Sequence, residues 1–502
     1  MGEAALPAPT RARPALAALV IASGALFALR VVAASRIGFG DSEALYASYA
    51  LHPQPAYLDH PGLVGALARL IGGGTAPSAL RAHLVTAALA TGFPWLLALA
   101  CRACGANPRR ALLVALVAAL TPEIAVGLLA LTPDLLLAYA WTGSLALAAQ
   151  GLGALPRSGR AAACFAGAGV LAGVAAASKV TGVCLAVALV AAYASRRARP
   201  RGGSLAPWAG LAAGALVVAP VLAFEAATGW PIVRHRLVDT QVDAGLSLRN
   251  LGAVLGGQLL YLSPLVLVLV FLAARAVAAE GPRDAVGQLL FAAVVVPMAA
   301  LVPLCLWSRV AEPHWLAPPL LALAMAAARS RLVVSRRLFG ASCALAGAMV
   351  VAVHAWVLVP GAVRLAPGSY DARLDISNEL YGWPDAAAAV REEAAGSWSP
   401  GMEPGDLVVA GPHWVICAQL DAALRGSLPV GCDTPVRDDF DDWLPRARWR
   451  RADVVIWVDD GRFGPPALPA YVPYRTRRTT VVRGGHTVRT FTITVLARRA
   501  AA

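Results

Sequence analysis

Charge is scarce in this 502-residue chain, because only 14% of the residues are Asp, Glu, Lys or Arg while 58% are hydrophobic. Soluble domains carry about a quarter charged residues, so an ordinary soluble multidomain protein is excluded. Lysine is scarcer still, since Lys179 is the only lysine among 43 basic residues. Apolar runs of about twenty residues recur from Ala15 to Pro360 and then stop. The sequence therefore predicts a membrane domain, residues 1–360, followed by a soluble domain, residues 361–502.

The apolar runs predict about eleven transmembrane helices. They lie near residues 14–34, 79–100, 111–131, 134–152, 161–178, 180–195, 206–226, 255–274, 285–306, 314–328 and 338–360. Every second linker is rich in arginine, which predicts that these linkers and the N-terminus face the cytoplasm. The net charge of +14 is thus a topology signal, and a nucleic-acid partner is not expected. An odd number of spans places the C-terminal domain outside the cytoplasm.

The C-terminal domain has the pattern of a small α/β fold. Strands are expected at 406–410, 453–458 and 487–496, and helices at 384–395 and 413–424. The acidic run 438–443 is interpreted as a solvated turn, not as a cation site. Cys417 and Cys432 both fall in this domain, where the compartment allows a disulfide, but their spacing does not show that they meet.

A long loop, residues 35–78, separates the first two spans and is predicted to lie on the outer side. Segments 42–51 and 61–71 have apolar residues at helical spacing, which predicts two short helices at the membrane surface. Long loops rich in aromatic and ionisable residues often carry function. This loop is therefore the expected catalytic segment.

Ionisable residues gather at the predicted outer face. They are Asp41, Glu43, Asp59, His60, Arg69, Arg81, Asp134, Lys179, Arg309, Glu312 and His314. Such groups are costly near hydrocarbon and mark functional sites by default. Any one of them is more simply explained as a charge at a span end, but a set of both signs on one side favours a shared site.

Transfer of a sugar from a lipid phosphate needs a base for the acceptor hydroxyl and cations for the departing phosphate. Lys179 suits a phosphate because its ammonium is a compact point charge; the alternative is snorkelling to lipid headgroups. Asp41 and Glu43 start a predicted surface helix and supply carboxylates, although a simple helix cap explains them equally well. Tyr46 and Tyr57 either stack on a sugar or belong to the interfacial aromatic belt.

Six segments in order carry a resemblance to a known family. They are 40–46 (GDSEALY), 57–62 (YLDHPG), 131–134 (LTPD), 178–179 (SK), 245–251 (GLSLRNL) and 309–315 (RVAEPHW). Together they resemble the bacterial branch of the dolichyl-phosphate-mannose protein mannosyltransferase superfamily, which includes lipid A aminoarabinose transferase and galacturonosyl transferases. The resemblance implies the glycosyltransferase C fold, a polyprenyl-phosphate sugar donor, inversion at the anomeric carbon and a catalytic aspartate in the first outer loop.

The match departs from the family at two positions. Relatives have an Asp-Glu doublet, whereas Ser42 separates Asp41 from Glu43 here; Asp41 is the expected catalytic residue and Glu43 the second candidate. The aminoarabinose transferase has Glu-Lys-Pro where this chain has Asp59-His60-Pro61, so His60 is expected to act in a pH-dependent way. The resemblance implies these substrate-binding residues: Tyr46, Tyr57, Asp59, His60, Asp134, Lys179, Arg309, Glu312 and His314.

No cofactor is required by these patterns, although some relatives bind a divalent metal near the first loop. The residues that could do so here are Asp41, Glu43, Asp59 and His314. The resemblance thus implies an inverting glycosyltransferase, which the topology signal places in a bacterial inner membrane, with a glycan, lipid or protein in the periplasm as the expected acceptor. The alternative is a transporter or lipid flippase, which should have internal repeats and charges at the bilayer midplane. Glu123 is the one carboxylate predicted deep in a span, and no half-repeat is evident.

Overall fold

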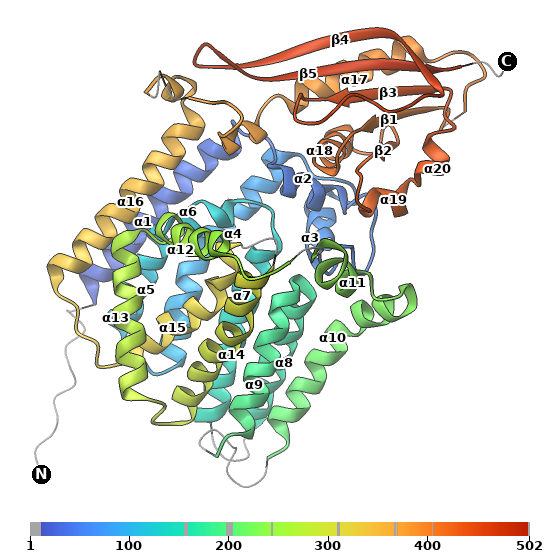
Figure 1. Ribbon diagram of the computed structural model, residues 1–502. Helices are drawn as coiled ribbons and strands as arrows, with labels where there is room; N and C mark the ends of the chain where they lie inside the picture. The colour runs from blue at the N-terminus through green and yellow to red at the C-terminus, as the bar shows by residue number, and fades with distance from the viewer. Residues whose placement is uncertain are drawn as a thin grey trace, which may run out of the picture.

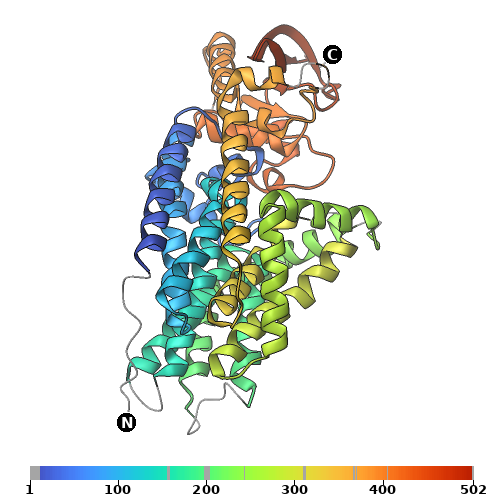
Figure 2. The same cartoon turned by 90° about the vertical axis from the view of Figure 1, so that its left-hand side faces the viewer.

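The computed structural model describes residues 12–154, 159–196, 204–241, 244–308, 312–365, 368, 370–403 and 405–499. A helical bundle forms most of the molecule, and a smaller sheet domain covers one of its ends (Figures 1 and 2). The bundle contains α1 Arg13–Ala34, α2 Asp41–Ser48, α3 Leu63–Gly72, α4 Ala79–Ala103, α5 Pro108–Leu120, α6 Pro122–Ala125, α7 Pro133–Gly153, α8 Gly159–Ser178, α9 Val183–Ala194, α10 Ala206–Thr228, α11 Pro231–Leu237, α12 Leu248–Tyr261, α13 Pro264–Glu280, α14 Ala285–Trp307, α15 Ala317–Arg329 and α16 Arg336–Leu358. Short 3-10 helices lie at Gly127–Leu129, Val180–Gly182, Asp239–Gln241, Pro313–Leu316, Pro360–Leu365 and Ile376–Leu380.

Seven of the described helices are long and apolar enough to cross a membrane: α1, α4, α7, α8, α10, α14 and α16. Two bent pairs can add one crossing each, α5 with residues 122–129 at 71° and α12 with α13 at 106°. Helices occur at all the predicted span positions, but those near 111–131 and 255–274 are not straight. Each breaks directly before a proline, Pro122 or Pro264, because the residue before proline is driven out of the helical region.

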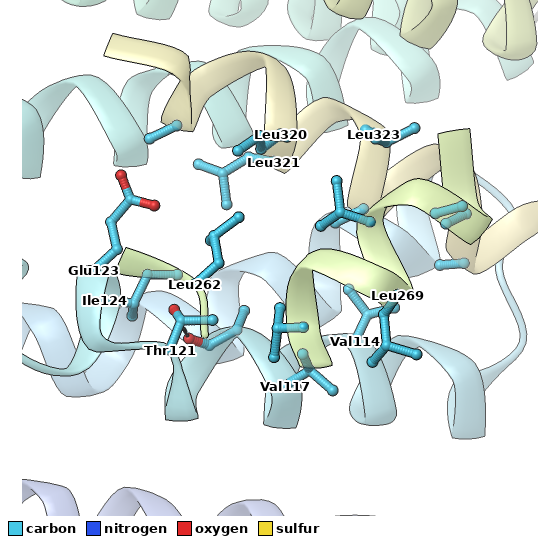
Figure 3. Close-up of a pocket in the computed structure, with 18 of the residues that line it drawn as sticks. Val114, Val117, Thr121, Glu123, Ile124, Leu262, Leu269, Leu320, Leu321 and Leu323 are labelled. Atoms are coloured by element: carbon cyan, nitrogen blue, oxygen red, sulfur yellow. Dashed lines mark hydrogen bonds between the residues drawn. The ribbon is translucent and has the colours of Figure 1, made fainter. Parts of the chain in front are cut away.

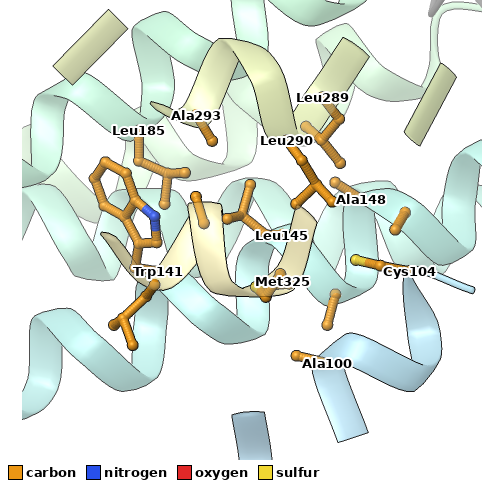
Figure 4. Packing of buried hydrophobic residues seen from close by; sticks show 14 of the residues in the cluster. Ala100, Cys104, Trp141, Leu145, Ala148, Leu185, Leu289, Leu290, Ala293 and Met325 are labelled. Atoms are coloured by element: carbon orange, nitrogen blue, oxygen red, sulfur yellow. The ribbon is translucent and has the colours of Figure 1, made fainter. Parts of the chain in front are cut away.

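The core of the bundle forms around α7, the most enclosed of the seven long spans. Figure 4 shows Trp141 and Leu145 of α7 packed among side chains of α9, α14 and α15. Trp141 is fully buried. A helix this enclosed is held in a fixed position, so the polar residues at its N-terminal end are held as well.

Helices α8 and α10 approach backbone to backbone. Gly169 and Gly173 of α8 face Gly210 and Gly214 of α10, and a Cβ added at Gly169 would lie 1.7 Å from the Gly210 carbonyl oxygen. Small residues four positions apart on both helices allow this close contact. Since α10 leads directly into α11, the contact fixes where α11 lies.

Gly210→Leu is expected to lower the melting temperature of the purified protein by roughly 5 °C or more, because the added side chain forces α8 and α10 apart. Thermal unfolding in detergent measures it. Gly24→Leu in α1 is the matched control, because a Cβ at Gly24 meets no atom within 4 Å. An equal loss in both variants would contradict the packing explanation.

The sheet domain follows α16. It contains α17 Trp383–Ser397, β1 Leu407–Gly411, α18 Trp414–Leu424, β2 Val430–Cys432, α19 Asp439–Trp443, α20 Arg446–Trp449, β3 Val454–Asp459, β4 Tyr471–Arg483 and β5 His486–Arg498. The strand order is β2-β1-β3-β5-β4. Strand β1 pairs in parallel with β2 and β3, with Val409 opposite Val430 and Ile456, whereas β5 is antiparallel to β3 and β4.

The predicted strands β1, β3 and β5 and helices α17 and α18 are confirmed. Two strands were not predicted. Strand β2 has three residues, and β4 is an edge strand whose side chains are mostly exposed and often arginine, so neither has the apolar pattern of a buried strand. The interpretation of residues 438–443 as a solvated turn is wrong, because they include helix α19 and Asp439 is only 6% exposed.

The first loop lies between the bundle and the sheet domain, with α2 against α18 (Figure 1). Its two predicted helices are confirmed as α2 and α3. Gln419 of α18 donates a hydrogen bond to the Phe39 carbonyl at 2.8 Å, and Ser48 donates to the Ala418 carbonyl at 3.2 Å. Helix α18 of the sheet domain thus anchors the first loop through these two hydrogen bonds.

Candidate active site

Three polar residues predicted from separate segments meet where α7 begins. Lys179 follows α8, Asp134 is the second residue of α7, and His314 lies in the 3-10 helix before α15. The Lys179 ammonium donates to both Asp134 carboxylate oxygens, at 2.8 and 2.9 Å, and to His314 Nε2 at 2.9 Å. Lys179 is 5% exposed, and such burial requires a partner of this kind.

Glu312 extends this group at its exposed side. One of its carboxylate oxygens lies 3.7 Å from His314 Nδ1, and its side chain is 44% exposed. Arg309, which was predicted to bind substrate, lies outside the described residues. The structure thus brings together Asp134, Lys179, Glu312 and His314, four of the eleven ionisable residues expected at the outer face.

A second group joins the first loop to α11. The Asp59 carboxylate lies 3.1 Å from Arg236 Nη2 and 3.4 Å from His235 Nε2. Burial opposes ionisation, but the His235 hydrogen bond and the Arg236 charge hold the pKa of Asp59 well below its usual range. Asp59 is therefore charged at neutral pH. The sequence analysis did not single out His235 or Arg236 as site residues.

His60 lies beside Asp59 and faces Arg236, with 3.5 Å between His60 Nε2 and Arg236 Nη2. Burial and then the Arg236 charge lower the pKa of His60 to about 3. His60 is therefore neutral near pH 7, and the pH dependence expected of it would fall only in the acidic range. Its Nδ1 is buried without a hydrogen-bond partner among the described residues.

Tyr46 connects the two groups. Its ring lies 5.5 Å from the His60 ring, centroid to centroid. Burial and then the charges of Asp59 and Asp134 raise the pKa of Tyr46. Asp59, His60, Asp134, Lys179, His235, Arg236, Glu312 and His314, with Tyr46, are called the polar cluster below.

Tyr57 has a different place from the one predicted. Its ring stacks on Tyr49 with 3.5 Å between centroids. Its hydroxyl donates to the carbonyls of Tyr49 and His52 and accepts from the Gln54 amide. These bonds occupy the hydroxyl and brace the loop internally, which favours a structural role over sugar binding.

Asp41 is directed to the sheet domain. Arg462 donates to one Asp41 carboxylate oxygen at 2.7 Å, and Gln419 donates to the other at 3.1 Å. The Asp41 side chain is only 8% exposed, compared with 29% for Asp59. Ser42 is the exposed residue at this end of α2. Sequence reasoning missed Arg462, because nothing local in the chain links a turn near residue 460 to the first loop.

Glu43 is fully engaged inside the fold. It accepts hydrogen bonds from His83 Nε2 at 3.0 Å, the Leu131 amide at 2.6 Å and the Gly40 amide at 3.1 Å. Burial opposes ionisation, but His83 and the two amides lower the pKa of Glu43. Its carboxylate therefore ties α2 to α4 and to the segment that starts α7.

A cavity of about 610 Å³ opens at the polar cluster. Glu123, Asp134 and His314 line one end, and Arg109, Arg110 and Arg336 line it too. Arg109 and Glu123 lie near opposite ends of α5, which spans about 20 Å. Figure 3 shows Glu123 at one end and leucine and valine side chains of α5, α13 and α15 along the cavity. The shape and lining suit a hydrocarbon chain whose polar head lies at the cluster.

The residues predicted as metal ligands do not form one coordination sphere. Asp41 is held by Arg462, Glu43 by His83, Asp59 by Arg236, and His314 by Lys179. Across the part of the chain that the structure describes, no group of three or more His, Cys, Asp or Glu side chains could hold a metal ion. Lys179 and Arg236 are the cationic side chains that pair with carboxylates in the polar cluster.

Asp439 of α19 joins the sheet domain to the first loop. It accepts hydrogen bonds from the Tyr49 hydroxyl at 3.0 Å and from the Leu58 amide at 2.9 Å. Burial raises the pKa of Asp439 to about 7, and the neighbouring Asp59 charge adds to this shift. The carboxyl group therefore changes its charge near physiological pH. Its hydrogen-bond donor Leu58 directly precedes Asp59 in the first loop.

Asp439→Asn is expected to flatten the pH dependence of stability. Because the folded-state pKa lies above the unfolded value of about 4, Asp439 stabilises the fold at low pH and loses that contribution as the pH rises through 7. The melting temperature of the native protein should fall by a few degrees between about pH 4 and 7, and that of the variant by less. If the melting temperatures of the native protein and the variant fall equally with pH, Asp439 is not the group responsible.

The chain is similar to a known family over part of its length and to solved structures in its fold. Residues 59–224 match the family model described as dolichyl-phosphate-mannose-protein mannosyltransferase. ArnT from Cupriavidus metallidurans, solved with undecaprenyl phosphate, is 15% identical with a TM-score of 0.61, over 95% of this chain and 97% of that one. The archaeal oligosaccharyltransferase AglB from Archaeoglobus fulgidus, solved with an inhibitory peptide and a dolichol-phosphate, is 13% identical with a TM-score of 0.51, over 88% and 69%.

The mycobacterial arabinofuranosyltransferase AftD is also similar, at 18% identity and a TM-score of 0.50, over 96% of this chain and 40% of that one. No curated protein sequence matches the chain. The fold, with its multiple membrane-spanning helices, is thus the one predicted from the sequence. Residues 59–224 of this multi-pass membrane protein are thus similar to the dolichyl-phosphate-mannose-protein mannosyltransferase family, and nearly the whole chain shares the fold of ArnT.

Proposed function

We propose that the protein is a membrane glycosyltransferase that moves a sugar from a polyprenyl-phosphate lipid to an acceptor hydroxyl. One observation carries the proposal: Asp134 and His314, which hold the buried Lys179, line one end of an apolar cavity. A lipid phosphate needs both features, a cation for its head and an apolar space for its chain. ArnT bound to undecaprenyl phosphate and AglB bound to a dolichol-phosphate support a donor of this class.

Two cations are available for the phosphate. Lys179 is positioned by Asp134, and Arg236 is positioned by Asp59. As the bond between the anomeric carbon and the phosphate oxygen breaks, negative charge develops on that oxygen. Fixed cations in a site that is partly closed to water stabilise this charge, which lowers the barrier.

Asp59 is the carboxylate of the first loop that lies in the cluster, and we assign it the role of base. The acceptor oxygen attacks the anomeric carbon from the side opposite the phosphate, and its proton passes to the Asp59 carboxylate. Such a single displacement inverts the anomeric centre, as the family resemblance implies. Asp59 suits this role because it is charged at neutral pH and 29% exposed.

Asp41 and Glu43 then have positioning roles. Asp41 anchors the sheet domain through Arg462, and Glu43 links the loop to the segment before Asp134. Asp41 is the alternative base; Arg462 and Gln419 would have to release it, just as Arg236 and His235 would have to release Asp59. The carboxylate variants described in the Discussion distinguish the two assignments.

The proposed orientation places the polar cluster and sheet domain on the outer side of a bacterial inner membrane, with the N-terminus in the cytoplasm. It is supported by described arginines at the far end of the bundle, including Arg109, Arg110, Arg329 and Arg336. The acceptor would then be a periplasmic glycan, lipid or protein.

A transfer assay tests the function. Purified protein in nanodiscs is incubated with radiolabelled polyprenyl-phosphate sugars and with an envelope extract as acceptor. We expect protein-dependent release of polyprenyl phosphate together with labelled product. A flippase would instead move the labelled lipid between the leaflets of a vesicle with its sugar intact, and that result would overturn the proposal.

A further inference from the structure

Two cysteines of the sheet domain lie against each other. Cys417 lies in the first part of α18, and Cys432 is the last residue of β2. Their Sγ atoms are 2.8 Å apart, closer than two unbonded sulfur atoms normally approach. Both residues are buried, Cys417 at 0% and Cys432 at 2% exposure, so each sulfur atom has the other as a fixed neighbour.

The sheet topology brings this pair together. Gly411 ends β1 and pairs with Cys432 on the neighbouring parallel strand. The chain then turns into α18 so that Cys417 comes back over Gly411, where a Cβ would lie 3.3 Å from the Cys417 sulfur. The missing side chain at residue 411 leaves room for the Cys417 sulfur atom above the end of β1.

We propose that Cys417 and Cys432 form a disulfide in the membrane-inserted protein, which attaches α18 covalently to β2. The inference rests on the proposed placement of the sheet domain outside the cytoplasm, because disulfides persist in oxidising compartments.

The oxidant required is the disulfide of a thiol–disulfide oxidoreductase. One cysteine thiolate attacks it to give a mixed disulfide, and the second thiolate then displaces the oxidoreductase. The new S–S bond takes the place of two S–H bonds, and the oxidoreductase leaves as a dithiol with the two electrons and two protons. Burial raises the pKa of Cys417 in the folded domain, so this exchange belongs to folding, before the pair is enclosed.

The bond would act on the surface that holds the first loop. Helix α18 carries Gln419, which donates to Asp41, and Asp421, which lies 3.2 Å from His52 Nε2. A cross-link at the start of α18 limits how far this surface can move from β2. It therefore stabilises the contact between the sheet domain and α2 without taking part in the chemistry.

Differential alkylation tests the bond in the full-length protein. Cells are lysed in denaturant with N-ethylmaleimide, and the protein is purified, reduced and labelled with iodoacetamide for peptide mass spectrometry. We expect Cys417 and Cys432 to carry only the second label, and a non-reduced digest to contain the two peptides cross-linked. Cys101 and Cys104, at the far end of the bundle, are the matched control and should carry the first label.

If Cys417 and Cys432 instead carry N-ethylmaleimide, their thiols were free in the cell and the proposed disulfide is wrong. This labelling experiment needs no sugar substrate, so its result is independent of the transfer assay and the two proposals are tested separately. A second measurement follows stability: reductant should lower the melting temperature of the native protein by roughly 5 °C and leave that of Cys417→Ser/Cys432→Ser unchanged. An equal response in both proteins would show that the pair contributes no cross-link.

Discussion

Lys179→Met is expected to lower the rate of sugar transfer by about 100-fold or more, because it removes a buried cation from the place where the departing phosphate gains charge. Methionine keeps much of the length of lysine but carries no charge. The measurement is kcat and KM with a purified polyprenyl-phosphate sugar. The loss should appear in kcat, because the charge on the phosphate oxygen grows as its bond to the sugar breaks.

The single variant also leaves the Asp134 carboxylate without its counterion, which can unfold the protein. Asp134→Asn/Lys179→Met removes both charges and should restore the melting temperature while transfer stays lost. If the double variant regains activity, Lys179 serves only as the counterion of Asp134, and its assignment to the phosphate is wrong.

Asp59→Asn is expected to lower kcat by at least about 100-fold with a small change in KM, because asparagine cannot accept the acceptor proton. Asp41→Asn should keep most of the activity and instead lower the melting temperature, since Arg462 loses its charged partner. Asp239→Asn is a matched control: it lies next to α11, its side chain is 44% exposed, and it should change neither quantity.

The reverse result is equally informative. If Asp41→Asn is folded but inactive while Asp59→Asn keeps full activity, the base is Asp41, and Arg462 must release it during turnover. The sequence expectation would then hold, and the contact between Arg462 and Asp41 would describe a resting arrangement of the sheet domain. A melting temperature within about one degree of the native protein must accompany that result, since an unfolded variant would also be inactive.

Much of the fold follows from local patterns in the chain. Apolar length locates the bundle helices, helical spacing locates α2 and α3, and apolar alternation locates β1, β3 and β5. The meeting of Asp134, Lys179 and His314 follows from topology, because each residue was placed at the same face of the membrane. These predictions succeed because each sequence pattern lies within the same short segment as the structural element that it predicts.

The remaining features depend on contacts between distant parts of the chain. Asp41 and Arg462 are 421 residues apart in sequence, and Asp439 finds its partners in the first loop. No local sequence pattern indicates that Asp41 pairs with Arg462 or that Asp439 contacts the first loop. Asp41 was therefore expected to be the catalytic base, and residues 438–443 were interpreted as a solvated turn. The 106° bend between α12 and α13 was also missed, because hydropathy reports length and not direction.

The pairing of Lys179 with Asp134 bears on how the reaction cycle ends. A donor phosphate that reaches Lys179 replaces an anion already in contact with it, so its binding exchanges one partner for another. The polyprenyl phosphate product competes with the same carboxylate. It is released when Asp134 pairs with the Lys179 ammonium again. A resident competitor of this kind limits product inhibition and returns the enzyme to its starting state after each transfer.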